Sequence, residues 1–328
     1  MASTVNVTVV APGPGARAAV TEVEALFARV ERACTRFDPA SPLMRANAAG
    51  DAWAPVPVEC YLALVEAARA HRRTGGLFEP RVLSTLVGLG YRRTLPFQDG
   101  PVHLTVRGPD AVPPAPEIGR VGRWRPEFDP RRPAVRIGSR PVDLGGIGKG
   151  LAARWAGELL AGHGRAALVE AGGDCHLGGA GPDGDGWRVA VEDPFGGEAP
   201  VAVLALAGTG CATSSVRVRS WEVDGRRVHH IVDPRTGRSA DGGLRSVTVA
   251  GTDPATAEAW SKALLVAGRD RIGGLADGHG LAAFWVTDDG TSGCSHALRP
   301  AVAWTADGLG AGTRPRPYRS VRAVAPVA

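Results

Sequence analysis

A glycine-rich stretch in the middle of the chain carries the groups needed to bind a phosphate. Residues 142–150 read VDLGGIGKG and run into a helical pattern that starts at Leu151. Glycines let the backbone approach a ligand closely and adopt positive φ. The helix N-terminus behind them offers N–H groups and partial positive charge, and Lys149 adds a full charge. The stretch matches neither the Walker pattern nor the dinucleotide fingerprint. Since the chain has 45 glycines, a plain turn before a surface helix stays open as the alternative.

A second candidate segment is 228–237, VHHIVDPRTG, which is interpreted as a strand entering a turn at Asp233-Pro234. Histidine is the side chain best suited to accept a proton near neutral pH. From the residues alone, however, His230 is interpreted as a structural histidine that forms a hydrogen bond at the turn. An Asp before a proline commonly braces such a turn.

Composition limits the classes of protein that fit this chain. At 328 residues, 44% hydrophobic and 22% charged, it has the size of a globular protein with two domains or subdomains. The net charge is +5, but the arginines are scattered and are not interleaved with aromatics, which argues against a nucleic-acid partner. The five cysteines form no C-x-x-C pair, so neither a disulfide framework nor a zinc knuckle is indicated.

The first residues show no basic and apolar leader and no lipid-attachment cysteine. No run is long and apolar enough to span a bilayer. We therefore expect a cytoplasmic protein with no membrane partner.

The elements that position these segments follow from periodicity. Alternating residues predict a strand over Val5–Val10, and helical spacing predicts a helix over 16–33. Two prolines predict a loop over residues 35–47. A second helix over 56–73 is followed by a glycine turn over 74–80.

The second half of the chain is predicted to contain mostly strands. Asp253-Pro254 opens a helix over 255–267, with proline suitably at its first position. A hairpin closes the fold around the Asp289-Gly290 turn, and residues 311–328, rich in Pro and Arg, are expected to be a poorly ordered tail. Strands are expected at 134–137, 166–169, 187–191, 202–206, 246–250 and 282–286.

Taken in order, seven short motifs make the chain resemble the ApbE family, the FAD:protein FMN transferases. Each motif is weak alone, but seven in register are specific, and they extend from the first strand to the closing hairpin. They are Phe37-Asp38-Pro39 with Ser41 and Asn47; Thr74-Gly75-Gly76 with Phe78; Asp143-Leu144-Gly145-Gly146 with Lys149-Gly150; Gly172-Gly173; Ala212-Thr213-Ser214; His230-Ile231-Val232-Asp233; and Pro234-Arg235-Thr236-Gly237.

The resemblance implies an α+β fold for residues 1–310, with two interwoven α/β subdomains and the flavin nucleotide in the groove between them. It implies that the FAD pyrophosphate is split, that AMP leaves, and that FMN is joined to a Thr or Ser of an acceptor protein. His230 then becomes the candidate base for the acceptor hydroxyl, and Asp233 orients it or braces the turn. The residues expected to bind FAD are Asn47, Thr74, Gly75, Gly76, Phe78, Asp143, Gly145, Gly146, Lys149, Gly172, Gly173, Thr213, Ser214, Arg235, Thr236 and Gly237.

One departure concerns the magnesium ion that the resemblance implies. The family holds it with an Asp and a Thr four residues apart on a helix and with a main-chain carbonyl of the glycine turn. Here those positions are Glu258, Lys262 and Gly148, and an ammonium has no lone pair for a metal. Lys149 and Lys262 are the only lysines in the chain. We hypothesise that the Lys262 ammonium takes the metal's place; an i,i+4 ion pair with Glu258 is the simpler reading.

Two smaller departures lie near the site. The helix after the glycine turn has Arg154 where the family commonly carries an acid, and Glu170 and Asp174 flank the second glycine pair where the family has asparagines. We expect the two carboxylates to be paired, with Arg154 or Lys262. The alternatives to flavin transfer are hydrolysis of FAD to FMN and AMP, a reaction on another nucleotide or small metabolite, and flavin binding without catalysis.

Overall fold

The computed structural model describes residues 4–97, 102–104 and 123–306. Its largest element is a sheet in which every neighbouring pair of strands is antiparallel. The strands, in spatial order, are β1 (Val5–Val10), β6 (Ala166–Ala171), β7 (Asp174–Gly178), β10 (Thr209–Ser215), β15 (Leu244–Gly251), β16 (Ala282–Thr287) and β17 (Ser292–Cys294).

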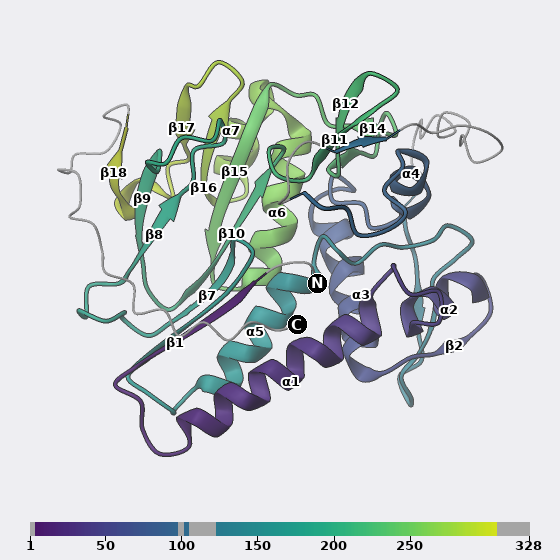
Figure 1. Ribbon diagram of the computed structural model, residues 1–328, viewed down its shortest axis with the longest axis horizontal. Helices are drawn as coiled ribbons and strands as arrows, with labels where there is room; N and C mark the ends of the chain where they lie inside the picture. The colour runs from purple at the N-terminus through teal and green to yellow at the C-terminus, as the bar shows by residue number, and fades with distance from the viewer. Residues whose placement is uncertain (1–3, 98–101, 105–122, 307–328) are drawn as a thin grey trace.

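Both faces of this sheet are covered, because successive side chains on a strand point to opposite faces. On β10, Ala212 packs in the core beneath the helices, and its neighbour Cys211 packs on the opposite side. The helices α1 (Ala16–Cys34), α5 (Gly148–Leu160) and α6 (Pro254–Ala267) lie along one face (Figure 1). A three-stranded sheet of β8 (Trp187–Val191), β9 (Ala202–Leu206) and β18 (Val302–Thr305) covers the other.

The remaining elements lie beside the helical layer, on the right of Figure 1. They are α2 (Pro42–Ala49), α3 (Val58–Arg73), α4 (Leu83–Gly88), β2 (Ala54–Pro55), β4 (Glu127–Phe128), β5 (Ala134–Arg136), β3 (His103–Leu104), β11 (Ser220–Val223), β12 (Arg226–His229), β13 (Val232–Asp233) and β14 (Arg238–Ser239). Some of them, including α2, α3 and β5, contribute to the largest core cluster, which joins α3 to α5 and α6, whereas α4, β3, β11, β12 and β13 contribute to a separate smaller cluster. Two further helical segments, α7 (Arg269–Gly278) and a 3₁₀ turn at Arg299–Ala301, pack near the sheet's end.

Several predicted elements are confirmed with their boundaries. The strand over Val5–Val10 and the helix behind Asp253-Pro254 are both present. The Asp253 side chain caps α6 by accepting from the N–H groups of Ala255 and Thr256. The closing hairpin forms between β16 and β17.

The predicted loop over 35–47 is wrong in its second half. Pro42 is the first residue of α2, and the Ser41 hydroxyl caps the helix by accepting from the Met44 N–H at 3.2 Å. Proline is favoured at that position because its missing N–H would have had no partner there. The helix after the glycine turn also begins earlier than expected, at Gly148, which places Lys149 in its first turn.

The predicted α+β class is confirmed by the mixture of helices and antiparallel sheets. The expected tail at 311–328, and the domain boundary before it, lie outside the described residues. In the part of the chain that is described, none of the helices has the length and apolar character needed to cross a membrane.

Candidate functional site

One pocket brings together segments that are far apart in the sequence. Its walls come from the end of α1, the segment after α3, the glycine turn before α5, the stretch after β12 and the inner face of α6. The pocket is lined both by residues that the sequence predicts for the site and by residues that it does not. The lining residues are Arg36, Leu77, Phe78, Glu79, Pro80, Val82, Leu86, Tyr91, Asp143, Gly145, Gly146, Arg219, His230, Ile231, Val232, Lys262 and Val266.

The glycine turn forms the floor of this pocket through close backbone contacts. The Asp143 carboxylate accepts from the Gly145 N–H at 2.6 Å, and the Asp143 N–H donates to the Pro80 carbonyl at 2.8 Å. A Cβ atom on Gly146 would lie 3.1 Å from the Phe78 ring and 3.3 Å from the Lys262 side chain. Glycine at 146 therefore lets the backbone, the aromatic ring and the lysine meet.

Four charged side chains form a buried cluster beside this turn, which we call the Glu258 cluster: Lys149, Asp174, Glu258 and Lys262. Glu258 is fully buried and Asp174 is 1% exposed. Glu258 Oε1 accepts from Lys149 Nζ at 2.8 Å and from Lys262 Nζ at 3.2 Å. Glu258 Oε2 accepts from the Gly150 N–H at 2.9 Å, and Lys149 also contacts Asp174. Two ammonium groups and two carboxyl groups thus meet between α5, β7 and α6.

The pKa values of the cluster follow from burial and from these contacts. Burial is the largest influence on Glu258 and raises its pKa, but Lys149, Lys262 and the Gly150 N–H outweigh it and lower the pKa to about 2. Burial, followed by the Glu258 charge, raises the pKa of Asp174. Burial lowers the pKa of Lys262, whereas for Lys149 the two carboxylates overcome burial and raise it.

These residues do not fit a magnesium site. Magnesium needs oxygen ligands in near-octahedral geometry, and each oxygen of Glu258 already accepts from a donor. One of those donors is the ammonium of Lys262 at the expected ligand position. No group of three or more His, Cys, Asp or Glu side chains suited to a metal occurs within the described ranges. Metal binding by Glu258 and Gly148 stays a prediction without support from this geometry.

His230 lies in the same pocket as the glycine turn and Lys262. Its Nδ1 lies 3.2 Å from the Arg219 carbonyl, and because a carbonyl only accepts, Nδ1 carries the proton. Nε2 therefore keeps its lone pair. Burial first, and then the charges of Arg219 and Lys262, lower the pKa of His230 well below its ordinary value. The imidazole is neutral at pH 7 and is able to accept a proton.

Asp233 braces the turn after β13, one of the two roles expected for it. Its carboxylate accepts from the Arg235 N–H at 2.8 Å and from Arg235 Nη2 at 2.8 Å. Arg235 also donates to the carbonyl of Val266 on α6, which ties the turn to the helix. The N–H groups of Thr236 and Gly237 close the turn by donating to the Asp233 carbonyl.

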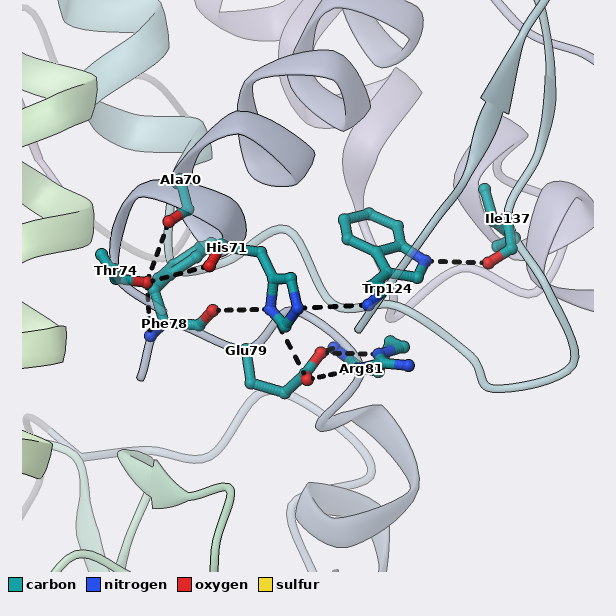
Figure 2. A network of polar contacts seen from close by, with 8 residues as sticks. All are labelled: Ala70, His71, Thr74, Phe78, Glu79, Arg81, Trp124 and Ile137. Carbon is teal, nitrogen blue, oxygen red and sulfur yellow. Dashed lines mark hydrogen bonds and ion pairs between the residues drawn. The ribbon is translucent and has the colours of Figure 1, made fainter. Parts of the chain in front are cut away.

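The wall between Thr74 and Arg81 is held by a network around His71 (Figure 2). His71 Nδ1 donates to the Phe78 carbonyl at 3.1 Å, and Nε2 accepts from the Trp124 N–H at 3.2 Å. The Thr74 hydroxyl accepts from the Phe78 N–H at 3.0 Å, and Glu79 forms a two-pronged pair with Arg81. We call this the His71 network; burial lowers the pKa of His71, which suits its neutral role.

Other predicted ligand residues support the backbone near the pocket. The Asn47 amide donates to the Val142 carbonyl and accepts from the Val142 N–H, at 2.9 and 2.8 Å. The Thr213 hydroxyl pairs with Thr248, and the Ser214 hydroxyl pairs with Ser261 on α6. Gly75, Gly76, Gly172 and Gly173 all occupy turns with positive φ. Contact of these residues with a nucleotide stays a prediction.

The expected partners of the extra carboxylates were partly wrong. Arg154 pairs with Glu66 and Asp253, not with Glu170 or Asp174. Glu170 instead accepts from the Asn6 side chain across the β1–β6 pair, at 2.7 Å. Asp174 pairs with Lys149, which the sequence had assigned to phosphate binding alone.

The pocket also contains residues that sequence reasoning missed, above all Arg36 and Tyr91. Arg36 directly precedes the Phe37-Asp38-Pro39 motif, but one arginine among 38 basic residues carries no signal of its own. Tyr91 lies in a stretch without periodicity and reaches the pocket only through the fold of the chain.

The chain is similar in sequence to proteins named FAD:protein FMN transferase. The Escherichia coli (strain K12) protein is 36% identical over 153 residues, which cover 46% of this chain and 44% of that protein. The aligned segment thus spans less than half of that relative. The Haemophilus influenzae protein is 28% identical over 282 residues, covering 82% of this chain and 79% of that protein.

Solved structures agree over most of the fold. The ApbE protein of Thermotoga maritima superposes with a TM-score of 0.72 at 26% identity, covering 90% of this chain and 94% of that one. The flavin transferase ApbE of Vibrio cholerae gives 0.73 at 25% identity, covering 92% and 96%. The ApbE family profile matches residues 1–285. Together with the shared fold, this match shows that the chain belongs to the ApbE family.

Proposed function

We propose that this protein is a flavin transferase that moves FMN from FAD to a threonine or serine hydroxyl of an acceptor protein and releases AMP. The observation that carries the proposal is that one pocket contains the glycine turn, the Lys262 ammonium and a neutral His230. The names of the relatives support the same reaction.

His230 is the base in the proposed step. Its Nε2 accepts the proton of the acceptor hydroxyl while that oxygen attacks the phosphorus of the FMN half of FAD. The bond from that phosphorus to the bridging oxygen breaks, and the bridging oxygen leaves with AMP. A neutral imidazole is required for this role, and the lowered pKa supplies it at pH 7.

Lys262 supplies positive charge to the reacting phosphates in place of the metal that the family resemblance implies. Phosphoryl transfer depends mainly on positioning and on neutralising charge, so a fixed ammonium is chemically suited to the task. Lys262 is anchored by Glu258 and reaches the pocket wall beside Gly146. Lys149, held by two carboxylates, supports this arrangement from behind.

The test uses the purified full-length chain with FAD, in EDTA and in Mg²⁺, and measures AMP release by chromatography. A second arm adds the acceptor protein of a characterised family relative and looks for covalent flavin fluorescence on a denaturing gel. We expect AMP release and labelled acceptor in EDTA. AMP without label would indicate FAD hydrolysis instead. Flavin binding without AMP would indicate a binding protein, and a strict need for Mg²⁺ would overturn the role of Lys262.

Replacing the base gives the largest expected loss of activity. His230→Gln removes the proton acceptor, and we expect AMP release to fall by about 10²- to 10⁴-fold with FAD affinity retained. His176→Gln is the matched control, because His176 is a partly buried histidine on β7 that does not line the pocket. Activity within about threefold of wild type in His230→Gln would exclude His230 as the base.

Three finer points stay predictions. The identity of the acceptor residue as Thr or Ser, the cytoplasmic location and the absence of a nucleic-acid partner each need their own measurement. Labelling the acceptor and mapping the modified residue by mass spectrometry decides the first of these.

A further inference from the structure

Arg36 lines the pocket and has a buried donor without a hydrogen-bond partner. Its Nε lies 2.8 Å from Asp143 Oδ2 in an ion pair, and its Nη1 donates to the Tyr91 carbonyl at 2.6 Å. The side chain is 6% exposed. Nη2, by contrast, is buried and has no hydrogen-bond partner.

The guanidinium is held rigidly, so Nη2 has a fixed place. Its central carbon lies 4.3 Å from the ring centroids of both Phe37 and Tyr91. The two rings, the ion pair with Asp143 and the hydrogen bond to Tyr91 together fix its plane. A donor fixed in a buried position without an acceptor is unfavourable in the free protein, which indicates that a ligand completes it.

Two other arginine atoms in the described ranges are buried without a hydrogen bond, Arg136 Nε and Arg245 Nε. Arg245 Nε lies 2.8 Å from Asp288 Oδ1 in an ion pair. The side chains of Arg136 and Arg245 are 35% and 33% exposed, and of the three arginines only Arg36 lines the pocket.

The charge around Arg36 decides which kind of acceptor fits. The Asp143 carboxylate balances the guanidinium, so the pair is neutral overall. The aromatic rings of Phe37 and Tyr91 pack against the guanidinium, and Val82 and Leu86 line the same pocket. A neutral pair with one free N–H in apolar surroundings suits a carbonyl or ring nitrogen of a planar ring. A phosphate would meet the Asp143 carboxylate there.

We propose that Arg36 Nη2 donates to a carbonyl or ring-nitrogen acceptor of the isoalloxazine ring, and so selects the flavin half of the substrate. This inference rests on the proposed function, because it takes FAD as the ligand. It makes Arg36 a specificity-determining residue and assigns the phosphates to the Lys262 side of the pocket wall.

The variant Arg36→Lys tests the proposal, because lysine can still pair with Asp143 but loses the planar fork. We expect the affinity for FMN and FAD, measured by flavin fluorescence, to fall about tenfold, with ADP affinity changed less than twofold. The carbonyl stretching bands of bound flavin, read by Raman spectroscopy, should shift to higher frequency. Arg245→Lys is the matched control, since Arg245 also stacks on an aromatic ring and pairs with an acid away from the pocket.

Equal losses for ADP and FMN would show that Arg36 contacts phosphate or supports the fold, and would overturn the proposal. Unchanged FMN affinity or unchanged carbonyl bands would do the same. Thermal unfolding of each variant shows whether it is folded, and Arg36→Met, which is unbranched but has no N–H donor, replaces the lysine variant if that one is not. A wild-type protein that binds no flavin would instead defeat the proposed function itself.

Discussion

The two walls of the pocket are held by opposite kinds of interaction. The Glu258 cluster uses full charges in a buried site, where two ammonium groups share one carboxylate. The His71 network is centred on a neutral imidazole that joins two backbone groups, and the ion pair that it contains, Glu79 with Arg81, lies between close neighbours in sequence (Figure 2). In the charged wall, formed by the Glu258 cluster, Lys262 lines the pocket, and we propose that it faces the phosphates of the substrate. The neutral wall sets the path of the backbone from Thr74 to Arg81.

The two walls should differ in how much stability the protein loses when a residue of the wall is substituted. A buried charge that loses its partner is costly, because solvent no longer compensates it. A neutral donor that loses its acceptor costs less. The walls should therefore differ in the size of the effect and in its dependence on pH.

The largest effect is expected on the charged wall. Glu258→Ala leaves two buried ammonium groups and the Gly150 N–H without their acceptor, and we expect the free energy of unfolding to fall by about 3–5 kcal/mol. Urea unfolding followed by circular dichroism measures it. Glu22→Ala is the control, because Glu22 is exposed and pairs at the surface with the half-exposed Arg29. A loss below about 1 kcal/mol would mean that the charged wall is no more sensitive than a surface pair.

The neutral wall should respond less strongly. His71→Leu has a similar volume but leaves the Trp124 N–H and the Phe78 carbonyl unpartnered, and we expect unfolding free energy to fall by about 1–3 kcal/mol. The same urea titration measures this change. If His71→Leu proved as damaging as Glu258→Ala, the contrast between the two walls would be lost.

The smallest expected effect is a pH dependence of the stability that His71 contributes to the neutral wall. The pKa of His71 is lowered by burial, so the folded protein binds fewer protons at this site than the unfolded chain does. Stability from the neutral ring is present above the unfolded pKa of about 6.5 and is lost as pH falls towards the folded pKa. The difference in stability between wild type and His71→Leu should therefore narrow below pH 6.5, by at most about 1.4 kcal/mol per pH unit.

Unfolding free energies of both proteins at pH 7.5, 6.5 and 5.5 provide the measurement. Because the difference is taken between two proteins, proton uptake by the other buried histidines cancels. A difference that stays constant over this range would show that His71 keeps the same protonation in the folded and unfolded chains.

Local signals in the sequence were enough for much of the fold. Asp253-Pro254 contains both the cap and the first residue of α6, and alternation alone marks β1. The sequence predicts a loop at Pro42, but a proline suits a loop and a helix start equally well. The Ser41 cap decides between the two. Whether this proline starts a helix depends on the contact of the Ser41 hydroxyl, which the spacing of apolar residues does not reveal.

The site was only partly predictable for a different reason. The glycine turn, His230 and Lys262 were found from motifs, and they do share a pocket. The pairing of Lys149 with Asp174 depends on the β6–β7 register, which places Asp174 opposite Ala171 beside α5. Glu258 contacts Lys149 although the two residues are 109 positions apart in the sequence. Contacts of this range arise from the packing of the sheet against the helices, so no local pattern predicts them.

The burial of both lysines has a practical consequence. Enzymes that cleave after lysine, and reagents that acylate amines, have their side-chain targets in this chain only at Lys149 and Lys262. Both amines are engaged by carboxylates in the folded protein. The native chain should accordingly resist a lysine-specific protease, and the rate of its cleavage should report how often this one region opens.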